Sequence, residues 1–229
     1  ADRVHHDSEA ERSNEYKEPP MRLLTLCLLS LLPLLAQARS IDQIEIAEQL
    51  SAGQELPALQ LNGAATRYFF GMVPVYIGAL YLEQPANNSQ QIITQDSAKR
   101  MQFVMRRDVR ARKIAEALSD ALSTNLDEAE LRQLQPQIDQ LMALYGNVTL
   151  HTGDVSSLDY LPGQGTRLIM DGKEKGRVPG KTLYDALLKV WIGHSPVSRE
   201  FKAAILGGAA PASARFDSAE NKNSLKAAN

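Results

Sequence analysis

The chain has 229 residues, of which 44% are hydrophobic and 23% are charged, as in an ordinary globular protein. This length allows one domain with terminal extensions, or at most two small domains. The formal net charge of −2 argues against a nucleic-acid-binding protein, which would normally carry a clustered basic excess.

The clearest signal near the start of the chain is MRLLTLCLLSLLPLLAQA, residues 21–38. A short positive start precedes an apolar run and the A-x-A cleavage site Ala36-Gln37-Ala38, which together form the pattern of a secretory signal peptide. A membrane anchor is the alternative, but the run is short for a span and Pro33 interrupts it. We therefore expect export with cleavage, which leaves no stable membrane span.

The position of this signal also determines how the residues before it and within it are interpreted. Export signals stand at the start of a chain, so residues 1–20 are interpreted as an upstream extension of Met21, disordered and outside the fold. Cys27 lies inside the apolar run, and the mature chain from Arg39 contains no cysteine. Disulfides, thiol catalysis and cysteine-based metal sites are therefore not expected after export.

Strand patterns dominate the segment that follows. Alternating apolar residues between turn residues predict short strands over residues 41–59. The apolar segments 61–70 and 73–83 predict two longer strands, and residues 99–105 predict another. The sequence PANNS, residues 85–89, is interpreted as a loop.

Helical spacing replaces the strand pattern after Asp108. Asp127 is expected to begin a second helix, and Pro136 is suited to the first turn of a third helix that ends at Gly146. The residues that share one face of the first helix are Ile114, Leu118, Ala121, Leu122 and Asn125.

Strands return at residues 154–180, where Pro-Gly and Asp-Gly turn signals predict an antiparallel meander of three strands. An amphipathic helix follows and ends at Gly193. Ser198 is expected to cap a last short helix that runs through Ile205. The small and polar residues 208–229 predict a disordered tail.

The order of these elements predicts the fold class. Strands, helices, strands and helices with antiparallel turns indicate an α+β fold, in which an antiparallel sheet carries a helical layer on one face. The predicted domain spans residues 41–207, an ordinary size for one domain.

Few residues suit catalysis or cofactor binding. His151 and His194 are the histidines of the predicted mature chain, and neither lies in a nucleophile or zinc signature. The glycine-rich turns lack the spacing of a phosphate-binding loop, so we expect no nucleotide, metal or other cofactor. The basic run at residues 105–113 is interpreted as a solvated strand end and helix start rather than a surface for an anionic partner.

The segments LNGAATRYFF (61–70) and VYIGALYLE (75–83) resemble the chalcone isomerase family, specifically its exported bacterial branch of chalcone isomerase-like proteins. The resemblance extends to ALLKVWIGHSPVSREFKAAILG and covers about residues 55–207. It implies an open-faced β-sandwich with a ligand cleft between the sheet and the helices, in a protein of the bacterial periplasm. Relatives include plant enzymes that cyclise chalcones and plastid fatty-acid-binding proteins.

The resemblance also places the plant active-site positions on this sequence. Arg67 matches the catalytic arginine that follows G-A-G-x in the plant enzymes. Tyr76, Arg110, Ala117 and Val190 stand where those enzymes carry threonine, tyrosine, asparagine, and threonine or serine. Only the arginine is retained, so the polar contacts that steer the substrate are replaced and the plant reaction is in doubt.

We favour a non-catalytic binder of a small amphipathic anion, such as a fatty acid, over an enzyme. A carboxylate in an apolar cleft needs one well-placed cation and apolar walls for its tail. The candidate ligand-binding residues are Arg67, Tyr76, Arg110, Phe69, Leu118 and Trp191.

Two alternatives remain open. The first is an isomerase, an intramolecular lyase that acts on a chalcone-like or other enone substrate with Arg67 as the catalytic residue. The second is a ligand-free envelope scaffold or interaction protein, in which Arg67 reaches solvent or pairs with Asp159 or Glu83. The identity of the ligand and the oligomeric state stay undetermined at this level.

Overall fold

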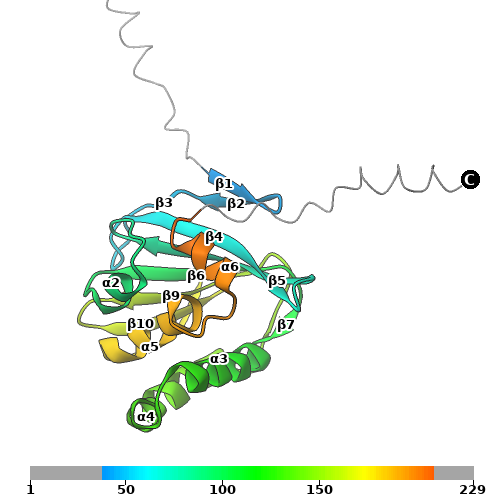
Figure 1. Cartoon of the computed structure of the whole chain (residues 1–229). Helices are drawn as coiled ribbons and strands as arrows, with labels where there is room; N and C mark the ends of the chain where they lie inside the picture. Colours follow the sequence, from blue (N-terminus) through cyan, green and yellow to red (C-terminus); the bar gives the residue numbers. More distant parts are fainter. Residues whose placement is uncertain (1–37, 209–229) are drawn as a thin grey trace, which may run out of the picture. The chain divides into compact units, whose positions relative to one another are not determined.

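The structure is a computed structural model that describes residues 38–208. The upstream extension, the predicted signal peptide except Ala38, and the tail beyond Gly208 lie outside the described residues. A seven-stranded antiparallel sheet with the order β11-β10-β9-β6-β5-β4-β3 forms the centre of the described part (Figure 1). Its strands are β3 (Gln49–Leu50), β4 (Leu59–Phe69), β5 (Val73–Leu82), β6 (Lys99–Met105), β9 (Val155–Leu161), β10 (Gly165–Met170) and β11 (Lys173–Val178).

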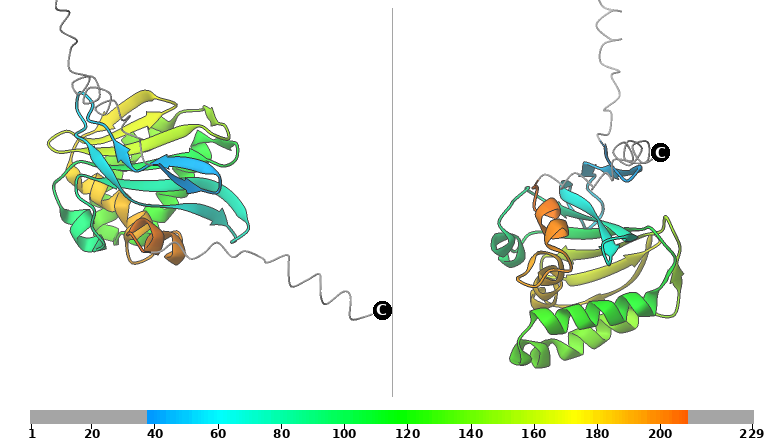
Figure 2. Two further views of the ribbon diagram at one scale, coloured as in Figure 1. Left: turned by 90° about the horizontal axis from the view of Figure 1, so that it is seen from above. Right: turned by 45° about the vertical axis from the view of Figure 1, so that its right-hand side comes forward.

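One face of the curled sheet carries the helical layer, as Figure 2 shows. The helices are α2 (Ser89–Thr94), α3 (Ala111–Asn125), α4 (Glu128–Tyr145), α5 (Lys181–Ile192) and α6 (Arg199–Ile205). Between sheet and helices lies a large apolar core, the helix-side core. This arrangement confirms the predicted α+β fold with an antiparallel sheet and a helical layer. Among the helices of residues 38–208, none combines the length and the hydropathy that a membrane span requires.

The opposite face of the sheet is covered near β4 by a hairpin of β1 (Ala38–Ile41) and β2 (Ile44–Ala47). Ile46 of this hairpin is buried in a second apolar core, the hairpin-side core. At its turn, Asp42 accepts hydrogen bonds from the hydroxyls of Thr66 and Tyr68, at 2.5 and 3.0 Å. The first described element thus begins at Ala38, three residues before the predicted start of the domain.

The prediction of separate second and third helices is wrong. One helix, α4, runs from Glu128 to Tyr145 with Pro136 inside it. A capping box starts it, because the Asp127 carboxylate accepts from the backbone N–H of Glu130, whose carboxylate accepts in return from the backbone N–H of Asp127. Pro136 is tolerated because it and Arg132, whose carbonyl loses its helical donor, are both exposed to water.

Helix α2 was not anticipated from the sequence. Its six residues are too few for a periodic pattern, and its cap, Asn88, lies in the segment interpreted as a loop. The side chain of Asn88 accepts a hydrogen bond from the backbone N–H of Gln91 at 3.0 Å. The helix then buries Ile92 and Ile93 in the helix-side core.

A network of ion pairs lies on the face of the sheet that bears the hairpin-side core. The fully buried Asp159 accepts from Nε and Nη2 of Arg100, at 2.6 and 2.8 Å, and from Nη2 of Arg167 at 2.8 Å. Glu55 links Arg167 to Arg177 at the edge of the sheet. Asp159 therefore positions two arginines, and neither of them is Arg67.

Lys99 is a buried basic group whose titration should be visible in the stability of the protein. It is 1% exposed, and its Nζ lies 5.2 Å from the centre of the Tyr160 ring. Burial, reinforced by the charge of Lys181, lowers the pKa of Lys99 to about 8. The unfolded chain holds this proton to a higher pH, so stability increases as pH rises through the folded pKa toward the unfolded one. Between about pH 7.5 and 9.5 we expect the free energy of unfolding to rise by about 1–2 kcal/mol.

Urea unfolding at a series of pH values measures this effect. Lys99→Met should remove the pH-dependent gain, whereas Lys173→Met, at an exposed site on β11, should retain it. An equal gain in wild type and Lys99→Met would assign the pH dependence to other groups.

Candidate functional site

Arg67 lies near the end of β4, on the side of the sheet that faces the helices. Gly63 and Ala65, which precede it at two-residue intervals, face α6 and the helix-side core. The strand register places Arg67 directly opposite Tyr76 of β5. The side chain of Arg67 is half-buried, so the guanidinium is neither fully solvated nor enclosed.

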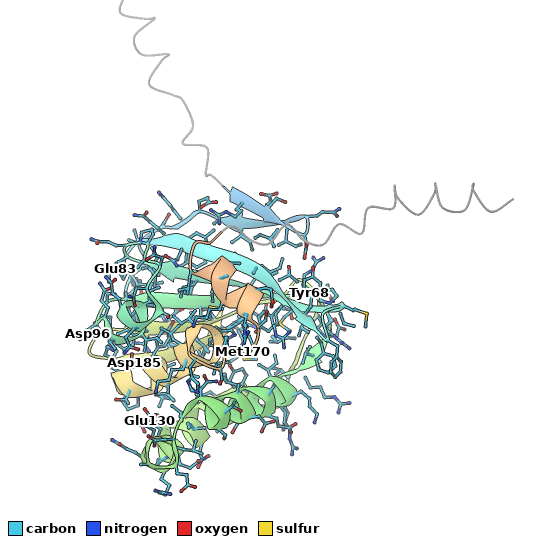
Figure 3. All side chains as sticks on the ribbon, viewed as in Figure 1. Tyr68, Glu83, Asp96, Glu130, Met170 and Asp185 are labelled. Carbon is cyan, nitrogen blue, oxygen red and sulfur yellow. The ribbon has the colours of Figure 1, made fainter. Side chains whose placement is uncertain are left out.

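The alternative in which Arg67 pairs with Asp159 or Glu83 is not what the structure shows. Asp159 binds other arginines, and the carboxylate of Glu83 accepts a hydrogen bond from the backbone N–H of Ala98 at 2.7 Å. Figure 3 shows Glu83 at the opposite end of the β4–β5 hairpin from Tyr68, the neighbour of Arg67. Nη1 of Arg67 donates to the carbonyl of Tyr68, and no carboxylate of residues 38–208 forms an ion pair with Arg67.

Tyr76 belongs to a group of rings that we call the aromatic cluster: Tyr76, Phe103, Trp191 and Phe201. The Tyr76 ring meets Phe103 and Phe201 edge-on, with centroids 5.2 and 6.0 Å apart, and Phe103 lies 5.2 Å from Trp191. Nε1 of Trp191 donates to the hydroxyl of Tyr76 at 3.0 Å. The cluster therefore joins β5 and β6 to α5 and α6.

The hydroxyl of Tyr76 is suited to donate a hydrogen bond to a ligand. Burial raises the pKa of Tyr76 to about 12, although the Trp191 hydrogen bond and the charge of Arg67 act in the opposite direction. The phenol therefore keeps its proton at neutral pH. Its oxygen accepts from Trp191, but its own proton has no acceptor among the residues that the structure describes.

Tyr145, in the last turn of α4, carries a second buried phenol. Its side chain is 5% exposed, and its hydroxyl forms no hydrogen bond with any described residue. Burial raises the pKa of Tyr145, and the nearby Tyr76 adds to this shift. The Tyr145 hydroxyl therefore keeps its proton at neutral pH, and it can donate a hydrogen bond to an acceptor that reaches it.

The structure brings together only part of the predicted set of ligand-binding residues. Arg67, Tyr76 and Trp191 are adjacent, and Leu118 is buried in the same helix-side core. Phe69 is 51% exposed at the end of β4, and Arg110 is exposed at the start of α3. Those last two residues lie outside the arrangement around Tyr76.

Three residues of this site were not among those predicted: Phe103, Phe201 and Tyr145. Phe103 alternates along β6 with Met101 and Met105, which marks it as facing the helices once that face is known. The sequence contains no comparable signal that α6 brings Phe201 to Tyr76.

Two pockets of the described part lie away from Arg67. A pocket of about 430 Å³ between the ends of α3 and α5 is lined by Asn125, Glu130 and Lys189, among others. A second, of about 610 Å³, lies along α3 and the end of α4. The rings of the aromatic cluster occupy the interior beside Arg67. No group of three metal-ligating side chains occurs among the described residues.

The described residues form a curled antiparallel sheet that helices cover on one face. Arg67 and the phenols of Tyr76 and Tyr145 lie at the edge of the apolar interior. The profile of the chalcone isomerase-like family matches residues 38–207, so the chain belongs to this family and the predicted resemblance is confirmed. A search of curated proteins found no match to the sequence.

A solved structure with the same fold is a fatty-acid binding protein of Arabidopsis thaliana. It superimposes with a TM-score of 0.61 at 14% sequence identity, and the match covers 75% of this chain and 96% of the plant chain. At 14% identity the similarity establishes the fold alone.

Proposed function

We propose that this protein binds the carboxylate of a small amphipathic anion, of the fatty-acid class, between the sheet and the helices. The observation that carries the proposal is the state of Arg67. It is half-buried, faces the helices, and has no carboxylate partner among the described residues. A carboxylate from outside the chain would supply the missing negative charge.

The neighbouring phenols complete a site for such a group. A guanidinium offers several N–H donors in one plane and can hold both oxygens of a carboxylate. Tyr76 and Tyr145 have hydroxyl protons without acceptors in the described part of the chain. One cation and two neutral donors suit a carboxylate better than a neutral ketone, which offers a single acceptor oxygen.

The aromatic cluster would provide the walls for the apolar tail. Its rings fill the interior beside Arg67, so a tail can enter only if side chains such as Phe201 change rotamer or α6 shifts. Because the ligand binds only the folded protein, it should raise the melting temperature, with the rise growing as the logarithm of the ligand concentration above the Kd.

A binder is favoured over the isomerase because two positions of the plant active site are unsuited to catalysis here. Val190 is buried in the core, and Ala117 is exposed on α3. Neither side chain can donate or accept a hydrogen bond. Export to a bacterial periplasm is part of the same proposal and rests on the pattern of residues 21–38.

The test of the proposed function is the affinity for a fluorescent fatty acid. Arg67→Ala should weaken binding by about 10–100-fold, because a charge-assisted hydrogen bond to a carboxylate is lost. Tyr76→Phe should weaken it less, since one neutral hydrogen bond disappears. Arg132→Ala, on the exposed face of α4, is the matched control and should bind as wild type.

Three outcomes would contradict the proposal. They are unchanged affinity in Arg67→Ala, equal affinity for the acid and its methyl ester, and no binding by the wild-type protein. Turnover of a chalcone above its spontaneous rate, abolished by Arg67→Ala, would support the isomerase instead.

A further inference from the structure

The turn between β4 and β5 presents an apolar surface that the ligand site does not use. We call residues 69–73 the hairpin tip. The exposed fractions are 51% for Phe69, 82% for Phe70, 78% for Met72 and 41% for Val73. These are four of the six large hydrophobic residues that are exposed in the described part, so the exposed apolar surface is concentrated on one turn.

The backbone of the tip directs these side chains outward despite an unfavourable conformation. The N–H of Met72 donates to the carbonyl of Phe69 at 3.2 Å, and φ is +48° at Phe70 and +71° at Gly71. Such a turn favours Asn-Gly, and a bulky residue with positive φ is strained. A phenylalanine at this position is therefore not explained by the needs of the turn.

Basic side chains flank the tip. Arg106 and Arg107 directly follow β6, and the N–H of Arg106 donates to the carbonyl of Val75 at 2.9 Å, so both lie at the hairpin end of the sheet. Arg107 is exposed, and Nε of Arg106 has no hydrogen-bond partner. The adjacent Asp108 is hydrogen-bonded to His151 at 3.0 Å, and this carboxylate raises the pKa of His151.

We propose that the hairpin tip inserts into the surface of a lipid bilayer that contains anionic lipids. The apolar side chains enter the boundary between headgroups and acyl chains, while the arginines contact lipid phosphates. A protein partner is less suitable because a stable interface uses about 20–30 residues on each side. The tip offers a single turn, which is enough for a bilayer because the lipids close around it.

This inference rests on the exposed surface and not on the proposed ligand. The two would nevertheless act together, because Arg67 precedes the tip by two residues. A protein docked by its tip would hold the carboxylate site next to the bilayer, where fatty acids partition.

Co-sedimentation with unilamellar vesicles tests the inference, using phosphatidylcholine alone or mixed with phosphatidylglycerol. The wild-type protein should bind the mixed vesicles more tightly. The double variant Phe70→Ser, Met72→Ser should lower the partition coefficient at least tenfold. Val148→Ser is the matched control, since Val148 is 44% exposed outside the hairpin. Arg107→Glu should reduce binding to the mixed vesicles selectively.

A fluorescence measurement locates the contact independently. The chain has one tryptophan, the buried Trp191, so Phe70→Trp adds an exposed reporter. Brominated lipids should quench the tryptophan emission of Phe70→Trp, and insertion into the bilayer should shift its emission maximum to the blue. The emission of a Val148→Trp variant should change no more than that of wild type.

Three results of the co-sedimentation experiment would overturn the inference. They are no vesicle binding by the wild-type protein, binding by the double variant equal to that of wild type, and a loss of binding in Val148→Ser equal to that in the double variant. Unquenched Phe70→Trp emission, or no preference for anionic vesicles, would also overturn it. Fatty-acid affinity in the absence of vesicles should be unchanged in the double variant, so the failure of tip insertion can be distinguished from failure of the ligand site.

Discussion

Asp159→Asn should lower the free energy of unfolding by about 3 kcal/mol, because Arg100 loses its carboxylate and the buried Arg167 keeps only the more exposed Glu55. Asp159 is fully buried and accepts from Arg100 at 2.6 Å and from Arg167 at 2.8 Å. Asparagine keeps the shape of the side chain but removes its charge. It also adds an N–H₂ donor, which would face the N–H donors of the arginines. Urea unfolding measured by circular dichroism checks this expectation.

The control for this substitution is Asp120→Asn, which makes the same chemical change at an exposed position on α3. It should alter stability by less than about 0.5 kcal/mol. If the two variants lose equal stability, the network around Asp159 is unimportant for the fold. Lost fatty-acid binding in an otherwise folded Asp159→Asn protein would instead connect the network to the ligand site.

Gly63→Ala should destabilise the protein by about 3 kcal/mol, at the upper end of the usual range for overpacking. A methyl group at Gly63 would lie 2.2 Å from the backbone oxygen of Ala204 and 2.8 Å from Cα of Ile205. Backbone atoms cannot move aside as a flexible side chain can, so α6 itself must shift. Asn62 fixes α6 from the same strand, since its Nδ2 donates to the carbonyl of Ile205 at 2.8 Å.

Gly53→Ala is the matched control for Gly63→Ala. An added methyl group at Gly53 meets no atom within 4 Å, and its φ is not in the left-handed region. We expect this variant to be as stable as wild type or slightly more stable. A small effect of Gly63→Ala would show that α6 can move away from β4 without loss of packing. That result would be relevant to ligand entry, because α6 carries Phe201 of the aromatic cluster.

The glycine that precedes Arg67 in the matched motif therefore has a packing role in this chain. The resemblance pointed to Gly63-Ala64-Ala65-Thr66-Arg67 as the segment of the catalytic arginine. In the structure, Gly63 has no side chain, so α6 can pack closely against β4. The small side chain of Ala65 leaves room for the helix-side core. The motif thus sets the distance between sheet and helix and also carries the cation.

Most of the secondary structure was predictable because it depends on neighbouring residues. The meander over residues 154–180 has its own turn signals, and Ser198 caps α6 as expected, accepting from the backbone N–H of Phe201 at 3.1 Å. The failures are also local in origin. Helix α2 is shorter than a periodic pattern, and Pro136 is tolerated inside α4 because its surroundings are solvated.

The sequence by itself determined the fold class, the family and the presence of Arg67 in an apolar strand, since each follows from composition, local spacing or motif. Only the tertiary structure decided what surrounds Arg67. Trp191 reaches the hydroxyl of Tyr76 across 115 residues of chain, and Asp159 binds Arg100 across 59. Such pairings depend on how strands and helices pack, and no local pattern specifies them. Arg67 is thus without a carboxylate in the described part of the chain because Asp159 and Glu83, the partners that the structural alternative offered, bind other groups.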